Sequence, residues 1–386
     1  MEQYMLYIAH LMKCAILGTI PDAVPDDIDL KKLIKYAAKH SVECCIYEAL
    51  SRLKIDNEAA MNELSMLCNR AVVRDTQQQY YLEKMLDAFE KNKITCILLK
   101  GTVIRDIYPV SYLRESCDID ILVCDGFECV DGVMREIGFD VEDYENDNSH
   151  HDIYMIKPYV TVEIHKRLMR KQHAWSYEFD NMPLRKIAYN DYKYIYRFSY
   201  EDFYLFMLAH MAKHVKFSGI GLKSVMDIWI YNIKCADKMD MPLLEKRIEK
   251  SELTVFNAAV KQLAEYLFEG ADTTEDIKEF AEFLFLSGSY GDSQQISAYK
   301  TYERQLKNKS NLNFYFKSFF CPAISLERNY PVLKKYPWIL PAVWIHRGFS
   351  LVFKRNKDMK RFIDNVENAD AELGKKLYDM KERLGL

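Results

Sequence analysis

The spacing of apolar residues changes twice along the chain. Up to about residue 92, apolar residues recur every three or four positions, which is the spacing of one face of a helix. This pattern predicts helices over Tyr4–Leu17, over Leu30–Leu53 with a break near Ser41, and over Glu58–Lys91. The first part of the chain is therefore expected to be helical.

The middle of the chain, from Ile94 to Lys166, has the shorter period of strands. Val160–His165 alternates apolar and polar residues at every position. With residues 152–156 and the turn-like residues 157–159, it predicts a hairpin. Short helices are expected near residues 103–107 and 127–137, and from about Tyr200 the helical spacing returns and continues to the end.

These elements predict an α+β fold, in which a small mixed β-sheet forms a core between helical N-terminal and C-terminal lobes. The expected divisions are a helical lobe over 1–93, a core over 94–190 and a helical C-terminal domain over 191–386, with residues 191–196 as a connection. Near the end, the aromatic stretch 313–322 is expected to pack on the helical lobe, and 357–386 to form a charged helix.

Composition limits the classes of protein that fit. A chain of 386 residues that is 49% hydrophobic can bury a large core. A net charge of -4 argues against a surface that attracts nucleic acid everywhere. The ten cysteines include no Cys-x-x-Cys pair, which fits reduced thiols, and no run reaches the roughly 18 apolar residues of a membrane span. We expect a cytoplasmic protein without a membrane span.

Two carboxylates mark the candidate chemistry. Asp118 and Asp120 lie two positions apart in a predicted strand, so they project from the same face. Glu163 alternates with apolar residues in another predicted strand and can face the same side. Two divalent cations held roughly 3.5 to 4 Å apart by such carboxylates can stabilise an in-line displacement at phosphorus. Mg²⁺ is the expected metal, because it prefers few carboxylates together with substrate phosphates.

Phosphate-binding groups surround these carboxylates in the sequence. Gly101 and Thr102 form a turn whose backbone amides can approach a triphosphate. Lys100, as a point charge, and Arg114, through its planar fork, are suited to neutralising phosphate oxygens.

The order of these elements resembles the nucleotidyltransferase superfamily that includes DNA polymerase beta, poly(A) polymerase and small antibiotic-modifying nucleotidyltransferases. It is most similar to a bacterial branch with five ordered elements. Here these are Leu99-Lys100-Gly101, Tyr108-Pro109, Arg114, Asp118-Ile119-Asp120 and Glu163-Ile164-His165.

The resemblance implies a reaction. The protein would use two Mg²⁺ ions, or Mn²⁺ in their place, to move a nucleoside monophosphate from a nucleoside triphosphate to a hydroxyl or phosphate acceptor, releasing pyrophosphate. ATP is the commonest donor among similar enzymes. Asp118, Asp120 and Glu163 would hold the metals, and Glu163 could help to deprotonate the acceptor.

The resemblance also implies that a helical domain, beginning with the helix Tyr200–Val215, forms the second wall of the cleft. Lys213, His214 and Lys223 would approach phosphate or acceptor from this wall. His165 would either touch substrate beside Glu163 or pack as a structural histidine.

Three questions stay open at the level of sequence. The core could instead be a catalytically silent nucleotide-binding scaffold or interaction protein. His210 and His214 share one helix face and could bind zinc with Asp227, although Asp227 could equally pair with Lys223 four residues earlier. The acceptor could be a small molecule, a protein or an RNA, and a protein partner is conceivable.

Overall fold

The contacts of the chain divide it into two units. A computed structural model describes residues 1–143, 151–158, 160–168, 179, 185–306, 319–323, 326, 330, 332–353 and 370–386. The first unit comprises Met1–Tyr290 and Leu384–Leu386, and the second comprises Gly291–Arg383. All of the predicted site residues belong to the first unit. The three lobes expected from the sequence stay a prediction.

The N-terminal helices follow the predicted pattern. They are α1 (Glu2–Leu17), α2 (Leu30–His40), α3 (Glu43–Leu50) and α4 (Glu58–Lys91). The expected break at Ser41 is present, because this residue takes a left-handed conformation with φ 53° and ends α2. The Asp29 side chain caps α2 by accepting hydrogen bonds from two backbone amides, and the Asn57 side chain caps α4 by accepting one from the Ala60 amide.

A mixed seven-stranded sheet confirms the α+β prediction. Its strands are β1 (Thr95–Leu98), β2 (Ile119–Asp125), β3 (Asp140–Asp143), β4 (His151–Ile156), β5 (Val160–His165), β6 (Lys186–Ala188) and β7 (Ile195–Phe198). Across the sheet their order is β3-β4-β5-β2-β1-β7-β6. β2 runs parallel to β5 and antiparallel to β1, and β4 and β5 form the expected hairpin. Tyr159 of its turn lies outside the described residues.

The region expected to connect the core to the C-terminal helices contains a strand instead. In β7, Ile195 and Tyr196 pair in parallel with Cys96 and Ile97 of β1, so the sheet extends beyond residue 190. The physical reason is burial, since Ile195 and Phe198 are almost completely shielded from solvent. Such a short strand is stabilised by the sheet that it joins rather than by its own pattern.

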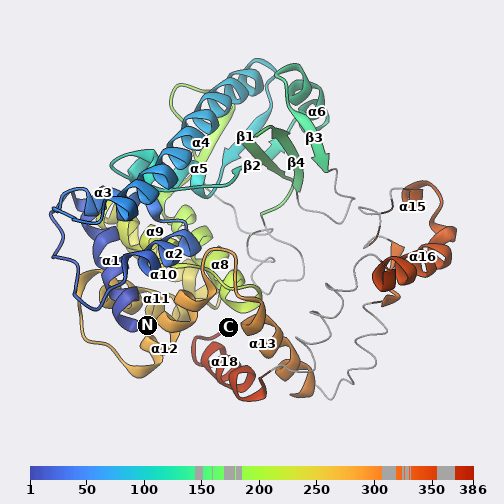
Figure 1. Cartoon of the computed structure of the whole chain (residues 1–386). Coiled ribbons are helices and arrows are strands. Elements are labelled where there is room, and N and C mark those ends of the chain that lie inside the picture. Colours follow the sequence, from blue (N-terminus) through green and yellow to red (C-terminus); the bar gives the residue numbers. More distant parts are fainter. Residues whose placement is uncertain are drawn as a thin grey trace. The chain divides into compact units, whose positions relative to one another are not determined.

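Short helices fill the connections within the sheet. These are α5 (Gly101–Ile104), the 3-10 turns η1 (Arg105–Ile107) and η2 (Ser111–Leu113), and α6 (Phe127–Glu136). The long helix α4 lies along the sheet and contacts β5 and β7 (Figure 1). Leu82, Met85, Leu86 and Phe89 of α4 are buried, at the spacing of one helix face.

Helices form the rest of the first unit. They are α8 (Tyr200–Phe217), α9 (Leu222–Cys235), the 3-10 turn η3 (Ala236–Lys238), α10 (Met241–Lys250), α11 (Thr254–Ala264), the π-helical turn η4 (Glu265–Glu269) and α12 (Glu275–Ser287). Ser199 directly follows β7 and caps the N-terminus of α8, because its side chain accepts a hydrogen bond from the Asp202 amide. α8 is therefore fixed at its start to the edge of the sheet core.

The second unit is also helical where it is described. It contains α13 (Ser293–Leu306), α15 (Val332–Lys335), the 3-10 turn η6 (Pro337–Ile339), α16 (Leu340–Phe353) and α18 (Ala371–Arg383). α13 packs against α18. Most of the predicted aromatic stretch, 313–318, and the first half of the predicted charged helix, 357–369, lie outside the described residues. Of the helices that can be described, none combines the length and the apolar character needed to cross a membrane.

Candidate functional site

The register of the sheet brings two acidic residues side by side. Asp120 of β2 and Glu163 of β5 are direct partners on neighbouring parallel strands. His165 Nε2 lies 2.8 Å from Asp120 Oδ1 and 3.4 Å from Glu163 Oε2. One ligand atom from each of these residues lies within 4.8 Å of the others. Two carboxylates and an imidazole at this spacing can hold a divalent cation.

Asp118 lies at the edge of this cluster. It immediately precedes β2 and is partly exposed, whereas Asp120 is buried. The Ser116 hydroxyl is 3.0 Å from the Asp118 carbonyl oxygen and 3.3 Å from Oδ1. Burial and the neighbouring charge of Asp120 raise the pKa of Asp118 to about 6. The tight trio is thus Asp120, Glu163 and His165, while Asp118 lines the same pocket.

Lys100 faces the carboxylates from the turn between β1 and α5. Its Nζ lies 2.6 Å from Asp120 Oδ1, and 22% of the side chain is exposed. Burial lowers the pKa of Lys100, but the charges of Asp120, Asp118 and Glu163 outweigh this and raise it. Burial raises the pKa of Asp120, but Lys100 and His165 outweigh this and lower it. The site therefore neutralises Asp120 with its own side chains.

The backbone at Lys100 is strained. Its φ is 43° and its ψ is -126°, a combination that residues with a side chain rarely adopt. The following Gly101 lines the pocket, and a Cβ at this position would lie 2.8 Å from Ser116 Oγ. Thr102 behaves differently from the prediction, because its side chain is buried and its amide donates to the Leu99 carbonyl. Of the predicted glycine turn, Gly101 reaches the pocket.

Arg114 is bound by Asp227, a residue of α9 that lies 113 positions later in the sequence. Its Nε and Nη2 donate to Asp227 of α9 at 2.7 and 2.8 Å, and its Nη1 donates to the Glu115 carbonyl. Burial lowers the pKa of Arg114, but the charge of Asp227 outweighs this and raises it. Asp227 also accepts a 2.6 Å hydrogen bond from the Tyr108 hydroxyl. Arg114 therefore joins two elements of the pocket as well as lining it.

These contacts argue against two alternatives raised by the sequence, the pairing of Asp227 with Lys223 and a zinc site that includes Asp227. Asp227 pairs with Arg114 rather than with Lys223, whose Nζ donates to the Glu115 carbonyl at 2.8 Å. Asp227 is also not the third ligand of a zinc site with His210 and His214, because Arg114 and Tyr108 bind its carboxylate. Among the described residues, the cluster spaced to hold a metal is Asp120, Glu163 and His165.

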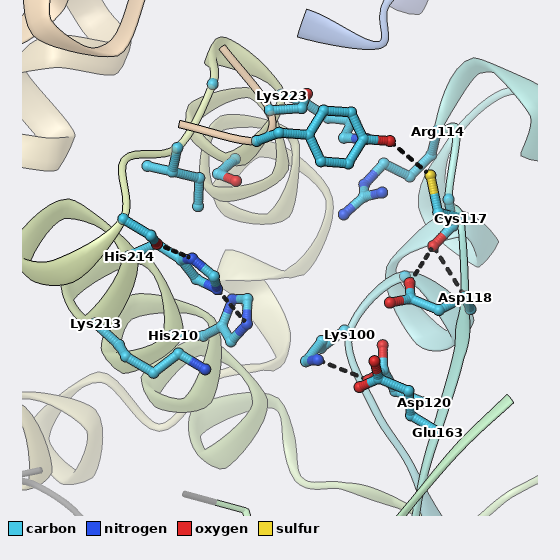
Figure 2. A pocket seen from close by; sticks show the side chains of 18 of the residues that line it. Lys100, Arg114, Cys117, Asp118, Asp120, Glu163, His210, Lys213, His214 and Lys223 are labelled. Carbon is cyan, nitrogen blue, oxygen red and sulfur yellow. Dashed lines mark hydrogen bonds and ion pairs between the residues drawn. The ribbon is translucent and has the colours of Figure 1, made fainter. Parts of the chain in front are cut away.

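α8 and the start of α9 provide the opposite wall. His210, Lys213 and His214 of α8 and Lys223 of α9 line the same pocket as the carboxylates. Figure 2 shows the side chains of His210 and Lys213 extending from α8 toward the side that carries Lys100. His214 lies beside His210, with the two Nε2 atoms 3.1 Å apart. Burial, followed by the charge of Arg114, lowers the pKa of Lys223.

The pocket between these walls has a volume of about 540 Å³, which suits a nucleotide-sized ligand. It contains all of the predicted site residues except Thr102. The sequence analysis missed Ser116 and Cys117 on the strand side, and Ser289 and Tyr290 after α12. The Tyr290 hydroxyl lies 2.9 Å from Cys117 Sγ, although the two residues are 173 positions apart. No local motif indicates such a contact.

Comparison with known protein families identifies a match. A family model described as "Uncharacterised nucleotidyltransferase" matches residues 26–269. This range includes the sheet, the pocket carboxylates and both histidines of α8. Neither the curated proteins nor the solved structures contain a match.

Proposed function

The chain belongs to the uncharacterised nucleotidyltransferase family, and we propose that it transfers a nucleoside monophosphate from a nucleoside triphosphate to an acceptor, releasing pyrophosphate. The observation that carries this proposal is the pairing of Asp120 with Glu163 across β2 and β5, in a pocket that is also lined by Lys100, Arg114, Lys213 and Lys223. ATP is the first donor to test.

The donor atoms fit Mg²⁺ or Mn²⁺. Asp120 and Glu163 offer carboxylate oxygens close together, and Asp118 adds a third carboxylate in the same pocket. We propose that these three residues hold the metal, while His165 orients Asp120 through its 2.8 Å contact. When bound, the cations would stabilise negative charge on the attacking and leaving oxygens.

The basic residues have separate roles in this proposal. Lys100 exchanges its contact with Asp120 for a phosphate oxygen, and Lys213 and Lys223 approach the polyphosphate from the opposite wall. Gly101 leaves room for the phosphates beside Ser116. Arg114 contributes its positive charge to the pocket, since its donor groups are bonded to Asp227 and Glu115. Positioning and electrostatics supply most of the catalysis in such reactions.

The first test is a thermal-shift titration with Mg²⁺ alone, with each nucleoside triphosphate alone, and with both together. A ligand at 100 times its Kd stabilises the folded state by about 2.7 kcal/mol. We expect a clear shift for the wild type with both ligands, and none for Asp120→Asn. The matched control is Asp131→Asn, a partly exposed aspartate of α6 that pairs with Arg135 outside the pocket. It should respond like the wild type.

Two results separate the competing functions. An equal shift in Asp120→Asn and in the wild type would contradict the proposed site. A shift without pyrophosphate release, in the presence of a broad set of acceptors, would favour the silent nucleotide-binding scaffold.

A further inference from the structure

Two histidines on the opposite wall form a hydrogen-bonded chain that the proposed metal site does not use. His210 Nε2 lies 3.1 Å from His214 Nε2, and His214 Nδ1 lies 2.8 Å from Ser218 Oγ. All three residues line the pocket, and Figure 2 shows the dashed contact between His210 and His214. The His210 ring stands on the side of the chain that faces Lys100 (Figure 2).

The hydrogen bond between the two Nε2 atoms restricts the protons of the pair. When both rings are neutral, one Nε2 must carry the proton and the other must accept it. The Ser218 hydroxyl can donate to the Gly219 carbonyl at 3.5 Å, which lets Ser218 Oγ accept from His214 Nδ1. His214 Nε2 then accepts from His210 Nε2. This arrangement leaves His210 Nδ1 with a free lone pair.

His210 Nδ1 has no hydrogen-bond partner within the described part of the chain, so a ligand in the pocket can reach it. The charged and titratable groups around the ring are Lys213 and His214 on α8, and Lys100 and His165 on the sheet side. Burial, followed by His214 and Lys100, lowers the pKa of His210 well below its usual value. The ring is therefore neutral at pH 7 and able to accept a proton.

The other groups of the pocket have other roles in the proposed function, in which Asp118 and Glu163 hold the metal together with Asp120. Lys100 and His165 stabilise the charged form of Asp120, which lowers its pKa. Lys213 and Lys223 lie on the same wall as His210 and are assigned to the polyphosphate. His214 uses both ring nitrogens within the chain of hydrogen bonds. His210 is thus the neutral base that faces the proposed metal site.

We propose that His210 is the general base of the transfer and that the acceptor is a neutral hydroxyl, an alcohol or a phenol. This inference rests on the proposed function and narrows its acceptor. A phosphate or carboxylate acceptor has an ionised oxygen at pH 7 and needs no base. A hydroxyl must lose its proton as it attacks, and a base in the opposite wall is suited to that task.

The acceptor oxygen forms a bond to the α-phosphorus of the nucleoside triphosphate, while the bond from this phosphorus to the bridging α–β oxygen breaks. Pyrophosphate leaves with that electron pair, and the hydroxyl proton moves to His210 Nδ1. His214 keeps the His210 ring oriented through the Nε2 contact. His210 then returns the proton to solvent. His214 is a positioning residue here, because it acts through His210.

The test uses α-labelled nucleoside triphosphate with Mg²⁺ and the full chain. Hydroxyl probes are glycerol, uridine and tyrosine amide at high concentration, and probes without a hydroxyl are methyl phosphate and acetate. We expect label on a hydroxyl probe. His210→Gln should lower kcat by roughly 100-fold or more, with the affinity for Mg²⁺ and nucleotide unchanged. The matched control is His346→Gln, an exposed histidine outside the pocket lining, which should leave kcat unchanged.

The pH profile separates a base from a structural residue. The wild-type kcat should rise with pH as His210 loses its proton, and this rising limb of the profile should disappear in His210→Gln. In His214→Gln the limb should move to higher pH, because His214 helps to lower the pKa of His210.

Three results would overturn the proposal: preferential labelling of methyl phosphate or acetate, a His210→Gln rate within threefold of the wild type, or bound nucleotide with no label on any hydroxyl probe. Failure of the wild type to bind Mg²⁺ and nucleotide would instead overturn the proposed function, and the role of His210 with it.

Discussion

Replacing Asp227 with asparagine tests the ion pair that joins two walls of the pocket. Asp227 of α9 accepts from Arg114 Nε and Nη2 at 2.7 and 2.8 Å, and the two side chains are only 9% and 11% exposed. Asparagine keeps the shape of the side chain but removes the negative charge. The Arg114 guanidinium would then remain buried without a compensating charge.

Breaking a buried pair in this way costs about 3–5 kcal/mol, because one charge stays desolvated. For domains of about 150–250 residues, each kcal/mol of lost stability lowers the Tm by about 2–4 °C. We therefore expect the Tm of Asp227→Asn to fall by roughly 10 °C. Urea denaturation of the full chain would measure the change in unfolding free energy. The midpoint should fall, and the slope should change little.

The exposed pair of Arg135 and Asp131 provides the matched control. Its N–O distance is 3.0 Å, but the side chains are 52% and 41% exposed, so Asp131→Asn should cost less than about 1 kcal/mol. The double variant Arg114→Met/Asp227→Leu should regain much of the lost stability, since it leaves no buried charge. Equal, small effects of Asp227→Asn and Asp131→Asn would refute this reasoning.

Two further predictions concern the positions of His40 and Gly101. Buried His40 accepts from the Leu222 amide and donates to the Phe285 carbonyl, and burial, followed by the charges of Lys39 and Lys223, lowers its pKa to about 3. The neutral His40 ring contributes its full stability above the unfolded pKa of about 6.5, and the free energy of unfolding falls with pH below that value, by about 2 kcal/mol at pH 5. Urea titrations at pH 7 and pH 5 should show this loss in the wild type. An equal loss in His40→Gln would contradict the role of His40. In Gly101→Ala the new Cβ would lie 2.8 Å from Ser116 Oγ, a steric conflict on the order of 1.4 kcal/mol. A thermal-shift titration should therefore show that Mg²⁺ and nucleotide bind roughly tenfold more weakly. Gly132→Ala, whose Cβ would meet nothing within 4 Å, should bind normally, and equal binding by both variants would argue against a tight Gly101 turn.

The parts of the site that depend on local spacing could be predicted from the sequence. Alternation in Val160–His165 placed Glu163 on one face of a strand, and the structure pairs it with Asp120. The i, i+4 spacing of His210 and His214 brought their rings together. In each case the period of a single element decides the result.

Contacts between distant segments could not be predicted in this way. The sequence indicated Arg114 as a phosphate ligand, but its partner Asp227 lies 113 positions away on α9. The contact between Cys117 and Tyr290 spans 173 positions. β7 was missed because its four residues form a strand only when β1 provides a partner. The packing of helices against the sheet sets these contacts, and no single segment encodes them.

The same packing explains how the site can hold its charges before a ligand arrives. Lys100 and His165 both lie within 3 Å of Asp120 Oδ1, so they neutralise a carboxylate that is almost completely buried. A divalent cation alone would have to bind beside the Lys100 ammonium, and a polyphosphate alone would have to approach the carboxylates. In the proposed function each ligand would remove the obstacle to the other, because the cation would bind Asp120 while the phosphate would bind Lys100. The proposed function therefore requires the two to bind cooperatively, with the shift for both together exceeding the sum of the separate shifts.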